Sequence, residues 1–271
     1  MLPGACWRVF MDFCPDPREN RLLAALPTAE LRRLTPQLEG VSLQQGQVLY
    51  ESGTRISEVY FPTTALVSTL YEFADGASAE TALVGNEGIV GIAVFMGGES
   101  RLGRALALSG GHAFRLKAQV LKDEFERSGP LMHLLLRYTQ ALITQIAQTA
   151  ACNRHHTLVQ RLCRLLLLSL DRLPDDDIVM TQELMAHMLG VRRESVTEAA
   201  FALQKLGLIH YARGRIAVLD RAGLGRRACE CYAAVHKEYD RLLPSKLVTK
   251  AGVRRRSSQP AVSTGLCSLA H

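Results

Sequence analysis

Five side chains within six positions have the hydrogen-bonding groups that read and hold nucleic acid. They are Arg192, Arg193, Glu194, Ser195 and Thr197. An Arg guanidinium can donate two hydrogen bonds to O6 and N7 of guanine, and a Glu carboxylate can accept one from N4 of cytosine. The hydroxyls of Ser and Thr suit phosphates or bases. This segment therefore predicts a surface that binds DNA and distinguishes its sequence.

The surrounding residues predict two helices that would present this segment. Thr181 can cap a first helix, and Gly190 can adopt the left-handed conformation of a tight turn. A second helix is expected over about 193–206. The apolar residues at helical spacing in the two segments are Leu184, Met185, Met188, Val196, Ala200, Leu203 and Leu206. Two helices joined by a three-residue turn form a helix-turn-helix, in which the start of the second helix meets base edges.

A second candidate contact follows the helix-turn-helix. Short apolar runs flank Arg213-Gly214-Arg215 and predict two strands joined by a turn, which is the pattern of a wing. Arg213 and Arg215 at its tip can reach phosphates or the minor groove. The alternative is an ordinary helical hairpin with a solvated Arg face. The turn, the helix pattern and the wing together favour the interpretation as a DNA-binding unit.

Other chemistry has little support in the sequence. No nucleophile elbow, phosphate-binding loop, zinc-protease motif or paired carboxylates are found, so we predict that the protein is not an enzyme. The seven cysteines are scattered and form no Cys-x-x-Cys pair, so neither a zinc ribbon nor a redox dithiol is indicated. A reducing compartment fits this cysteine usage best.

Cys152 and His156 lie four residues apart and would share one face of a continuous helix. A metal, haem or redox role is one interpretation. The favoured interpretation is a helix end with an ordinary buried cysteine and solvated histidines. We expect Cys229 and Cys231 to pack or to be exposed. The sequence thus predicts no metal site and no cofactor.

The composition indicates a folded protein with a sizeable core. The 271 residues are 48% hydrophobic and 21% charged, which suits one large domain or two of ordinary size. No apolar stretch reaches the roughly 18 residues of a membrane-spanning helix. The first thirty residues show no basic and then apolar leader. We therefore expect a cytoplasmic protein with no membrane partner.

The formal net charge of +6 is unevenly distributed. Residues 244–271 carry five basic side chains and no acidic one, and this segment reads as a disordered basic tail. The rest of the chain is nearly neutral. Residues 178–227, however, contain eight basic and four acidic side chains. The local excess around the helix-turn-helix supports DNA binding better than the net charge does.

The sequence before the helix-turn-helix predicts a β domain. Asp75-Gly76 is a strong hairpin signal, and short helices are expected over 20–26 and 28–38. About seven strands at this spacing predict a small sandwich, jelly roll or barrel. The expected strands are Val48–Tyr50, Val59–Phe61, Ala65–Tyr71, Ala79–Val84, Ile89–Phe95, Arg104–Leu108 and Ala113–Leu116.

A long helix is predicted next, from Pro130 to about Cys152. It is too apolar to stand alone in water, so it packs on the sheet domain, on a second copy of itself, or on both. We expect a dimer seam at Leu135, Tyr138, Leu142 and Ile146, which follow steps of three and four residues. A break at 153–156 and a second helix over 157–170 follow.

The chain resembles bacterial transcription regulators of the Crp/Fnr family over about 20–243. The most specific segments are Leu189-Gly190-Val191-Arg192-Arg193-Glu194-Ser195-Val196, Gly207-Leu208-Ile209 and Arg161-Leu162-Cys163-Arg164-Leu165-Leu166. The resemblance implies an α+β fold with an N-terminal β-roll or jelly-roll sensor domain, a long dimerisation helix and a C-terminal winged helix-turn-helix. It also places Arg193 and Glu194 at the positions that read bases.

The resemblance predicts a domain organisation. We expect a flexible N-terminus (1–17), with Met1 and Met11 both open as the start, and a cyclic-nucleotide-binding-like β-roll (18–129). A dimerisation helix and hinge (130–156), a winged helix-turn-helix (157–223), a C-terminal helix (224–243) and the basic tail (244–271) follow. The implied partners are a second copy of the chain, palindromic double-stranded DNA, RNA polymerase and a small-molecule effector.

Two residues of the expected recognition helix depart from the family's pattern. The family often has Ser at the N-cap of the recognition helix, where this chain has Arg192, and a lost cap costs about 1 kcal/mol. Many members carry an Arg where this chain has Glu198. We therefore expect the preferred DNA sequence to differ from the catabolite-activator site.

The sensor also departs from the cyclic-nucleotide binders of the family. Ile92 stands where their carboxylate lies, and Gly103-Arg104-Ala105 keeps an Arg but lacks the hydroxyl. We expect cyclic AMP binding to be lost or weak. In the alternative, Glu87 and Arg104 replace the missing groups in an effector pocket with Gly91 and Ile146. An iron–sulfur cluster is not expected, because Cys6 and Cys14 stand alone and four ligands are needed.

The sequence therefore predicts a homodimeric, sequence-specific DNA-binding transcription regulator with an allosteric sensor domain. The alternative is a small-molecule sensor that acts mainly through protein partners and keeps a vestigial DNA-binding domain.

Overall fold

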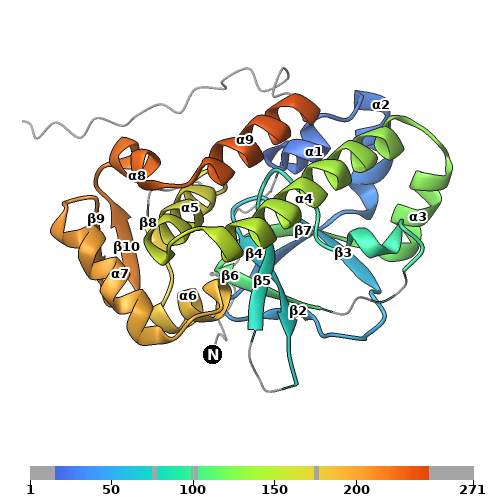
Figure 1. The fold of residues 1–271 in the computed structure, drawn as a ribbon. Helices are drawn as coiled ribbons and strands as arrows, with labels where there is room; N and C mark the ends of the chain where they lie inside the picture. Colours follow the sequence, from blue (N-terminus) through green and yellow to red (C-terminus); the bar gives the residue numbers. More distant parts are fainter. Residues whose placement is uncertain (1–15, 75–77, 99, 101–102, 174–176, 244–271) are drawn as a thin grey trace, which may run out of the picture.

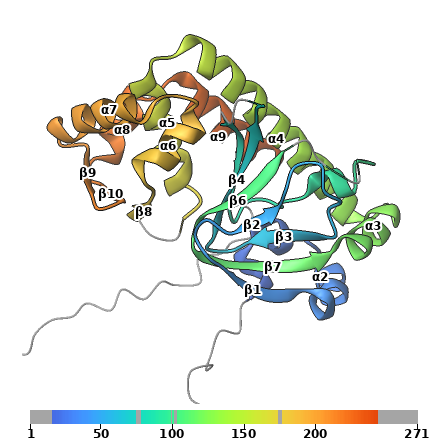
Figure 2. The same cartoon turned by 90° about the horizontal axis from the view of Figure 1, so that it is seen from below.

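The computed structural model describes residues 16–74, 78–98, 100, 103–173 and 177–243. Its N-terminal part is built from two antiparallel sheets (Figures 1 and 2). One sheet has the order β1 (Glu39–Leu43), β7 (Gly111–Lys117), β3 (Glu58–Pro62). The other has the order β2 (Val48–Tyr50), β6 (Arg104–Ser109), β4 (Leu66–Glu72), β5 (Ser78–Val84).

Short helices border these sheets. They are η1 (Pro17–Glu19), α1 (Arg21–Ala24), α2 (Thr28–Leu34), η2 (Thr35–Gln37) and α3 (Ala118–Glu126). The core is apolar and includes the fully buried side chains of Phe61, Leu66, Leu83, Leu108 and Leu116. The alternation of short apolar runs and turns in the sequence thus gives the expected β-roll.

Most of the predicted strands are confirmed, and two differences have a clear cause. Ile89–Phe95 is not a strand, because Gly91 adopts a left-handed conformation (φ 107°) and starts the short 3-10 helix η3 (Ile92–Val94). β1 carries little apolar pattern and was not expected; it pairs with β7 at the sheet edge. Asp75-Gly76 lies outside the described residues, but β4 and β5 on either side of it pair antiparallel.

Helix α4 (Pro130–His155) is longer than the sequence predicts. Residues 153–155 contain neither Gly nor Pro, so nothing ends the helix at Cys152. It ends at His156, which is extended, and Thr157 then caps α5 (Leu158–Leu170) through a capping box with Gln160. The turn between the two helices therefore lies at His156 and Thr157.

The apolar face of α4 is covered by the chain itself. Leu135, Tyr138 and Leu142 are fully buried, and Ile146 is half-buried. The Tyr138 hydroxyl donates to the carbonyl oxygen of Ile89 (3.3 Å), and its ring meets the edge of Tyr239 on α9. The expectation that Leu135, Tyr138 and Leu142 form a dimer seam is therefore wrong for this conformation, because their surfaces are already occupied.

The C-terminal part continues from α5 as a helix-turn-helix with a small sheet. Its elements are β8 (Asp177–Val179), α6 (Gln182–Leu189), α7 (Arg193–Lys205), β9 (Ile209–Ala212), β10 (Arg215–Val218), α8 (Arg221–Arg227) and α9 (Glu230–Leu242). The sheet order is β8-β10-β9. The single C-terminal helix predicted over 224–243 is two helices, and α9 runs back along α4 in the opposite direction (Figure 1). The predicted tail (244–271) and nearly all of the predicted flexible N-terminus lie outside the described residues.

A buried ion pair joins the C-terminal part to the sensor. Nε of Arg172, just after α5, donates to Oε1 of Glu87 in the loop after β5 (2.6 Å). Their side chains are only 5% and 8% exposed. Arg172 also donates to Oε1 of Gln145 on α4 (2.9 Å) and to the carbonyl oxygen of Leu168 (2.9 Å). One guanidinium thus connects the sensor loop, α4 and α5.

No helix among the described residues is long and apolar enough to cross a membrane.

We expect Arg172→Met to destabilise the protein by about 3–5 kcal/mol, because it leaves the buried Glu87 carboxylate without its partner. The double variant Arg172→Met, Glu87→Met should lose much less free energy of unfolding than the single variant Arg172→Met. Urea unfolding followed by circular dichroism measures both.

Arg104→Met is the matched control, since Arg104 pairs with Glu51 and Glu72 at partly exposed positions. Its loss should cost at most about 1 kcal/mol. Equal destabilisation by Arg104→Met and Arg172→Met would contradict a special role for the buried pair.

Candidate nucleic-acid interface

The turn between α6 and α7 is held by short-range contacts and by one helix behind it. Thr181 caps α6 and accepts a hydrogen bond from the backbone N–H of Leu184 (3.1 Å). Gly190 ends α6 in the left-handed conformation (φ 61°, ψ 43°), as expected. The buried Arg161 of α5 donates to the carbonyl oxygen of Leu189. This buried contact fixes the turn relative to α5.

Helix α7 packs with one face and leaves its start exposed. Its buried residues are Val196, Ala199, Ala200 and Leu203. Leu206, which the sequence places in the core, is the C-cap residue and is half exposed. α7 packs on α5 and α6, so its outer face and its first turn are directed to solvent (Figure 1). A helix with a free, exposed first turn can enter the major groove.

The structure brings most of the predicted contact residues to this exposed turn. Arg192, Arg193 and Glu194 are exposed and form no ion pair with other described residues. Arg192 occupies the N-cap without a side-chain cap, as expected. Ser195 is half-buried. The helix start therefore exposes two arginines and one glutamate, none of them in an ion pair with described residues.

Thr197 is exposed on α7, as predicted. Its hydroxyl donates within the protein, lying 2.8 Å from Oε1 of Gln182 at the start of α6 and 3.0 Å from the carbonyl oxygen of Arg193. It therefore links α6 to α7, and its acceptor lone pairs remain.

The predicted wing is a three-stranded sheet with an arginine tip. β9 and β10 pair antiparallel, with Ala212 opposite Arg215. Arg213 and Gly214 between them have φ values of 51° and 77°, as in a two-residue hairpin turn with both central residues left-handed. Arg213 and Arg215 are exposed at the end of the sheet. The wing lies beside α7, at the same end of the molecule (Figure 1).

The predicted effector pocket is not assembled. Nη1 of Arg104 lies 3.0 Å from Glu72, and its Nε lies 3.3 Å from Glu51, so two carboxylates already neutralise it. Glu87 is buried in its pair with Arg172. Gly91 starts η3, and Ile146 is half-buried on α4. Glu87 and Arg104 therefore serve two separate ion pairs and do not replace the missing cyclic-nucleotide ligands together.

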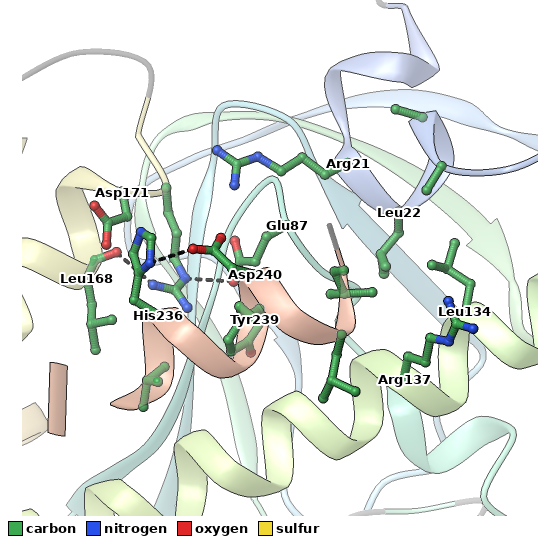
Figure 3. Close-up of a pocket in the computed structure, with 16 residues that line it drawn as sticks. Arg21, Leu22, Glu87, Leu134, Arg137, Leu168, Asp171, His236, Tyr239 and Asp240 are labelled. Carbon is green, nitrogen blue, oxygen red and sulfur yellow. Dashed lines mark hydrogen bonds and ion pairs between the residues drawn. The ribbon is translucent and has the colours of Figure 1, made fainter. Parts of the chain in front are cut away.

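A cavity of about 320 Å³ lies instead between α1, α4, α5 and α9. Arg21, Arg137 and Arg172 line it together with Tyr239 and Leu134. Figure 3 shows Arg21 from α1 on one side and Tyr239 and Asp240 from α9 on another. No sequence motif could have found this cavity, because its walls come from five segments far apart in the chain, the loop with Glu87 included.

Four potential metal ligands meet at the end of α4. Sγ of Cys152, Cys229 and Cys231 and a ring nitrogen of His156 all lie within 4.8 Å of one another. Cys152 is buried and Cys229 and Cys231 pack, as expected, but the expectation of solvated histidines is wrong for His156, which is largely buried. The start of α9, with Cys229 as its N-cap and Cys231 in its first turn, brings these two cysteines to the last turn of α4.

Comparison with known proteins agrees with this arrangement. Residues 160–227 match the Crp-like helix-turn-helix domain. No curated protein sequence matches the chain at a significant level. FixK2 from Bradyrhizobium japonicum has a similar structure, with a TM-score of 0.62 and 18% identity, covering 71% of this chain and 98% of FixK2.

Two further structures have the same fold. TTHB099, a transcriptional regulator of the CRP family from Thermus thermophilus, has a TM-score of 0.59 and 22% identity, covering 69% of this chain and 96% of its own. CLP from Xanthomonas campestris, described as a c-di-GMP responsive global regulator, has a TM-score of 0.57 and 14% identity. The match covers 71% of this chain and 99% of CLP.

Residues 160–227 match a Crp-like helix-turn-helix domain, and the chain has the same fold as these regulators. The expected α+β fold with an N-terminal sensor sheet, a long helix and a C-terminal winged helix-turn-helix is confirmed. The matched segment begins in α5 and ends with α8, so it contains both α7 and the wing. The match therefore identifies this C-terminal part as a Crp-like helix-turn-helix domain.

Proposed function

We propose that this protein is a Crp/Fnr-type transcription regulator, a homodimer that reads a palindromic operator by placing the start of α7 in the major groove of each half-site. The observation that supports it best is the exposed pair Arg192 and Arg193 at the first turn of α7, where neither forms an ion pair with described residues. In the proposed complex Arg193 donates to guanine, and Glu194 accepts from cytosine. Arg192 and Ser195 contact phosphates.

The other predicted contacts take supporting roles. Arg213 and Arg215 at the wing tip bind phosphates or enter the minor groove. Thr197 positions α7 through Gln182 and does not itself reach a base. This division separates residues that give sequence specificity from residues that give affinity.

The outer face of α4 is the proposed dimer seam. It exposes Leu136, Gln140, Ile143 and Ala147, which follow steps of four, three and four residues. Such spacing forms a continuous stripe when two helices pack side by side. Leu136 and Ile143 are 48% and 49% exposed, although both are apolar. A second copy of α4 would cover them, and its two-fold symmetry would match a palindrome.

The effector is proposed to differ from cyclic AMP. Arg104 is held by Glu51 and Glu72, so its charge is not free for a cyclic phosphate. A small molecule in the cavity between α1, α4, α5 and α9 would contact the sensor and the C-terminal domain at once. Such a ligand could shift the population of DNA-competent domain arrangements. RNA polymerase remains the protein partner expected from the family.

Arg193→Ala should weaken binding to a selected operator by about 1–3 kcal/mol, or roughly 5- to 150-fold in Kd, and relax specificity at one base pair. Fluorescence anisotropy with operator and random DNA measures both effects. Lys205→Ala, at the other end of α7, is the control and should change neither affinity. Arg215→Ala should weaken binding to operator and random DNA by the same factor. An equal loss on operator and random DNA with Arg193→Ala would refute the base contact.

Ile143→Asp combined with Leu136→Asp should convert the dimer to monomers, because two charges would face each other across an apolar seam. Light scattering after size exclusion gives the mass directly. Phe73→Asp changes an apolar residue outside α4 that is even more exposed (59%) and should leave the dimer intact. A monomeric wild-type protein, or a double variant that stays dimeric, would rule out this seam.

A further inference from the structure

The ligand cluster at the end of α4 has close internal distances. Sγ of Cys152 lies 3.4 Å from Sγ of Cys229, and Sγ of Cys231 lies 3.7 Å from Nδ1 of His156. Cys152 and His156 are four residues apart at the end of α4. Cys229 is the N-cap of α9, and Cys231 is in its first turn. Two helix ends thus contribute two ligands each.

These distances suit a tetrahedral metal ion. Zinc binds sulfur at about 2.3 Å, so two thiolates on the same ion lie about 3.8 Å apart. Three cysteines and one histidine form one of the usual structural zinc sets. The three cysteines are buried, and His156 is largely buried, so the site is closed to solvent as structural sites are. The four ligand atoms already lie within 4.8 Å of one another, so small side-chain adjustments would bring them around one ion.

The second ring nitrogen of His156 has the partner that a metal ligand requires. Nε2 lies 3.2 Å from Oε1 of Glu230, the first residue of α9. This contact places the proton on Nε2 and leaves the lone pair of Nδ1 directed towards the sulfurs. Metal-bound histidines almost always donate their other N–H to a carboxylate, a carbonyl or water.

Positive charge near the cluster would favour thiolates. The guanidinium of Arg164 is the cation beside Cys152. Arg164 is itself buried on α5 and donates to the hydroxyl of Thr149 (3.1 Å). A site with three thiolates and one divalent ion carries a net charge of −1, which Arg164 would partly balance.

A disulfide explains less of this arrangement. The four described cysteines, including Cys163, are free thiols. A bond between Cys152 and Cys229 would use two sulfurs and would leave Cys231, His156 and Glu230 without a reason to converge. A metal ion uses all four ligands and the carboxylate behind the histidine.

We propose that Cys152, His156, Cys229 and Cys231 bind one thiolate-preferring divalent ion of the zinc class. The ion would join the end of α4, at the hinge between the two parts of the chain, to the start of α9. It would therefore hold α9 along α4 and keep the C-terminal domain in the observed arrangement.

The test is the metal content of the full chain, purified with reductant and without chelator and measured by elemental mass spectrometry. We expect one zinc per chain. Replacement by cobalt should give the visible and near-ultraviolet bands of a tetrahedral thiolate site. A strong chelator should remove the metal and lower the thermal midpoint of the wild type.

Variants locate the site. Cys231→Ser and His156→Ala should lose the metal, whereas Cys163→Ala and His155→Ala should keep it. Cys163 is equally buried but outside the cluster, and His155 is the exposed neighbour of His156. Glu230→Gln keeps all four ligands and changes a side chain that is 81% exposed, so the protein should fold. Its metal affinity should fall by about 10- to 100-fold.

Three results would overturn the site. The first is a wild-type chain that holds no zinc after purification or after dialysis against zinc. The second is a disulfide between cluster cysteines in freshly purified, metal-free protein. The third is unchanged zinc content in the Cys152→Ser and Cys229→Ser double variant. None of these measurements uses DNA, so they stand apart from the tests of operator binding.

Discussion

The buried contact between Arg172 and Glu87 joins the two parts of this chain. Both charges are out of water, and such a pair is stable only when it is complete and hydrogen-bonded. Gln145 of α4 and the carbonyl oxygen of Leu168 complete it. Arg172 follows α5 directly, and α5 holds the turn of the helix-turn-helix through Arg161. A shift of the sensor loop would therefore be transmitted to the recognition helix by a short chain of buried contacts.

Helix α4 is the second part of this arrangement, because its two faces have different partners. The inner face, with Leu135 and Tyr138, is buried against the sensor and α9 of the same chain. The outer face, with Leu136 and Ile143, remains exposed and suits a second copy. The 320 Å³ cavity lies near the start of α4, and the four-ligand cluster lies at its end. α9 touches both, so its packing on α4 links the cavity, the hinge and the C-terminal domain.

Local features of this structure could be predicted from sequence because their causes are local. Thr181 and Gly190 determine the ends of α6, and Arg213-Gly214 determines the turn of the wing. The helical spacing of Leu135, Tyr138 and Leu142 correctly identified an apolar face. It could not show what covers that face, because periodicity is the same for a sheet, a partner helix or α9.

The contacts between residues far apart in the chain leave no local pattern in the sequence. Glu87 and Arg172 are 85 positions apart, and the Cys152 and Cys229 sulfurs come from residues 77 positions apart. Neither set has the close spacing of a motif, so only the folded chain brings them together. Ile89–Phe95 differs because two local signals conflict. Its apolar run predicts a strand, but the left-handed conformation of Gly91 prevents one.

Enrichment of bound sequences from a random DNA pool tests most directly whether this chain reads DNA as a symmetric dimer. We expect two inverted half-sites, about one helical turn or 34 Å apart between their centres. A guanine should recur at one position of each half-site, as contact with Arg193 requires. A pool without an enriched sequence, or with a single unpaired half-site, would contradict symmetric operator recognition.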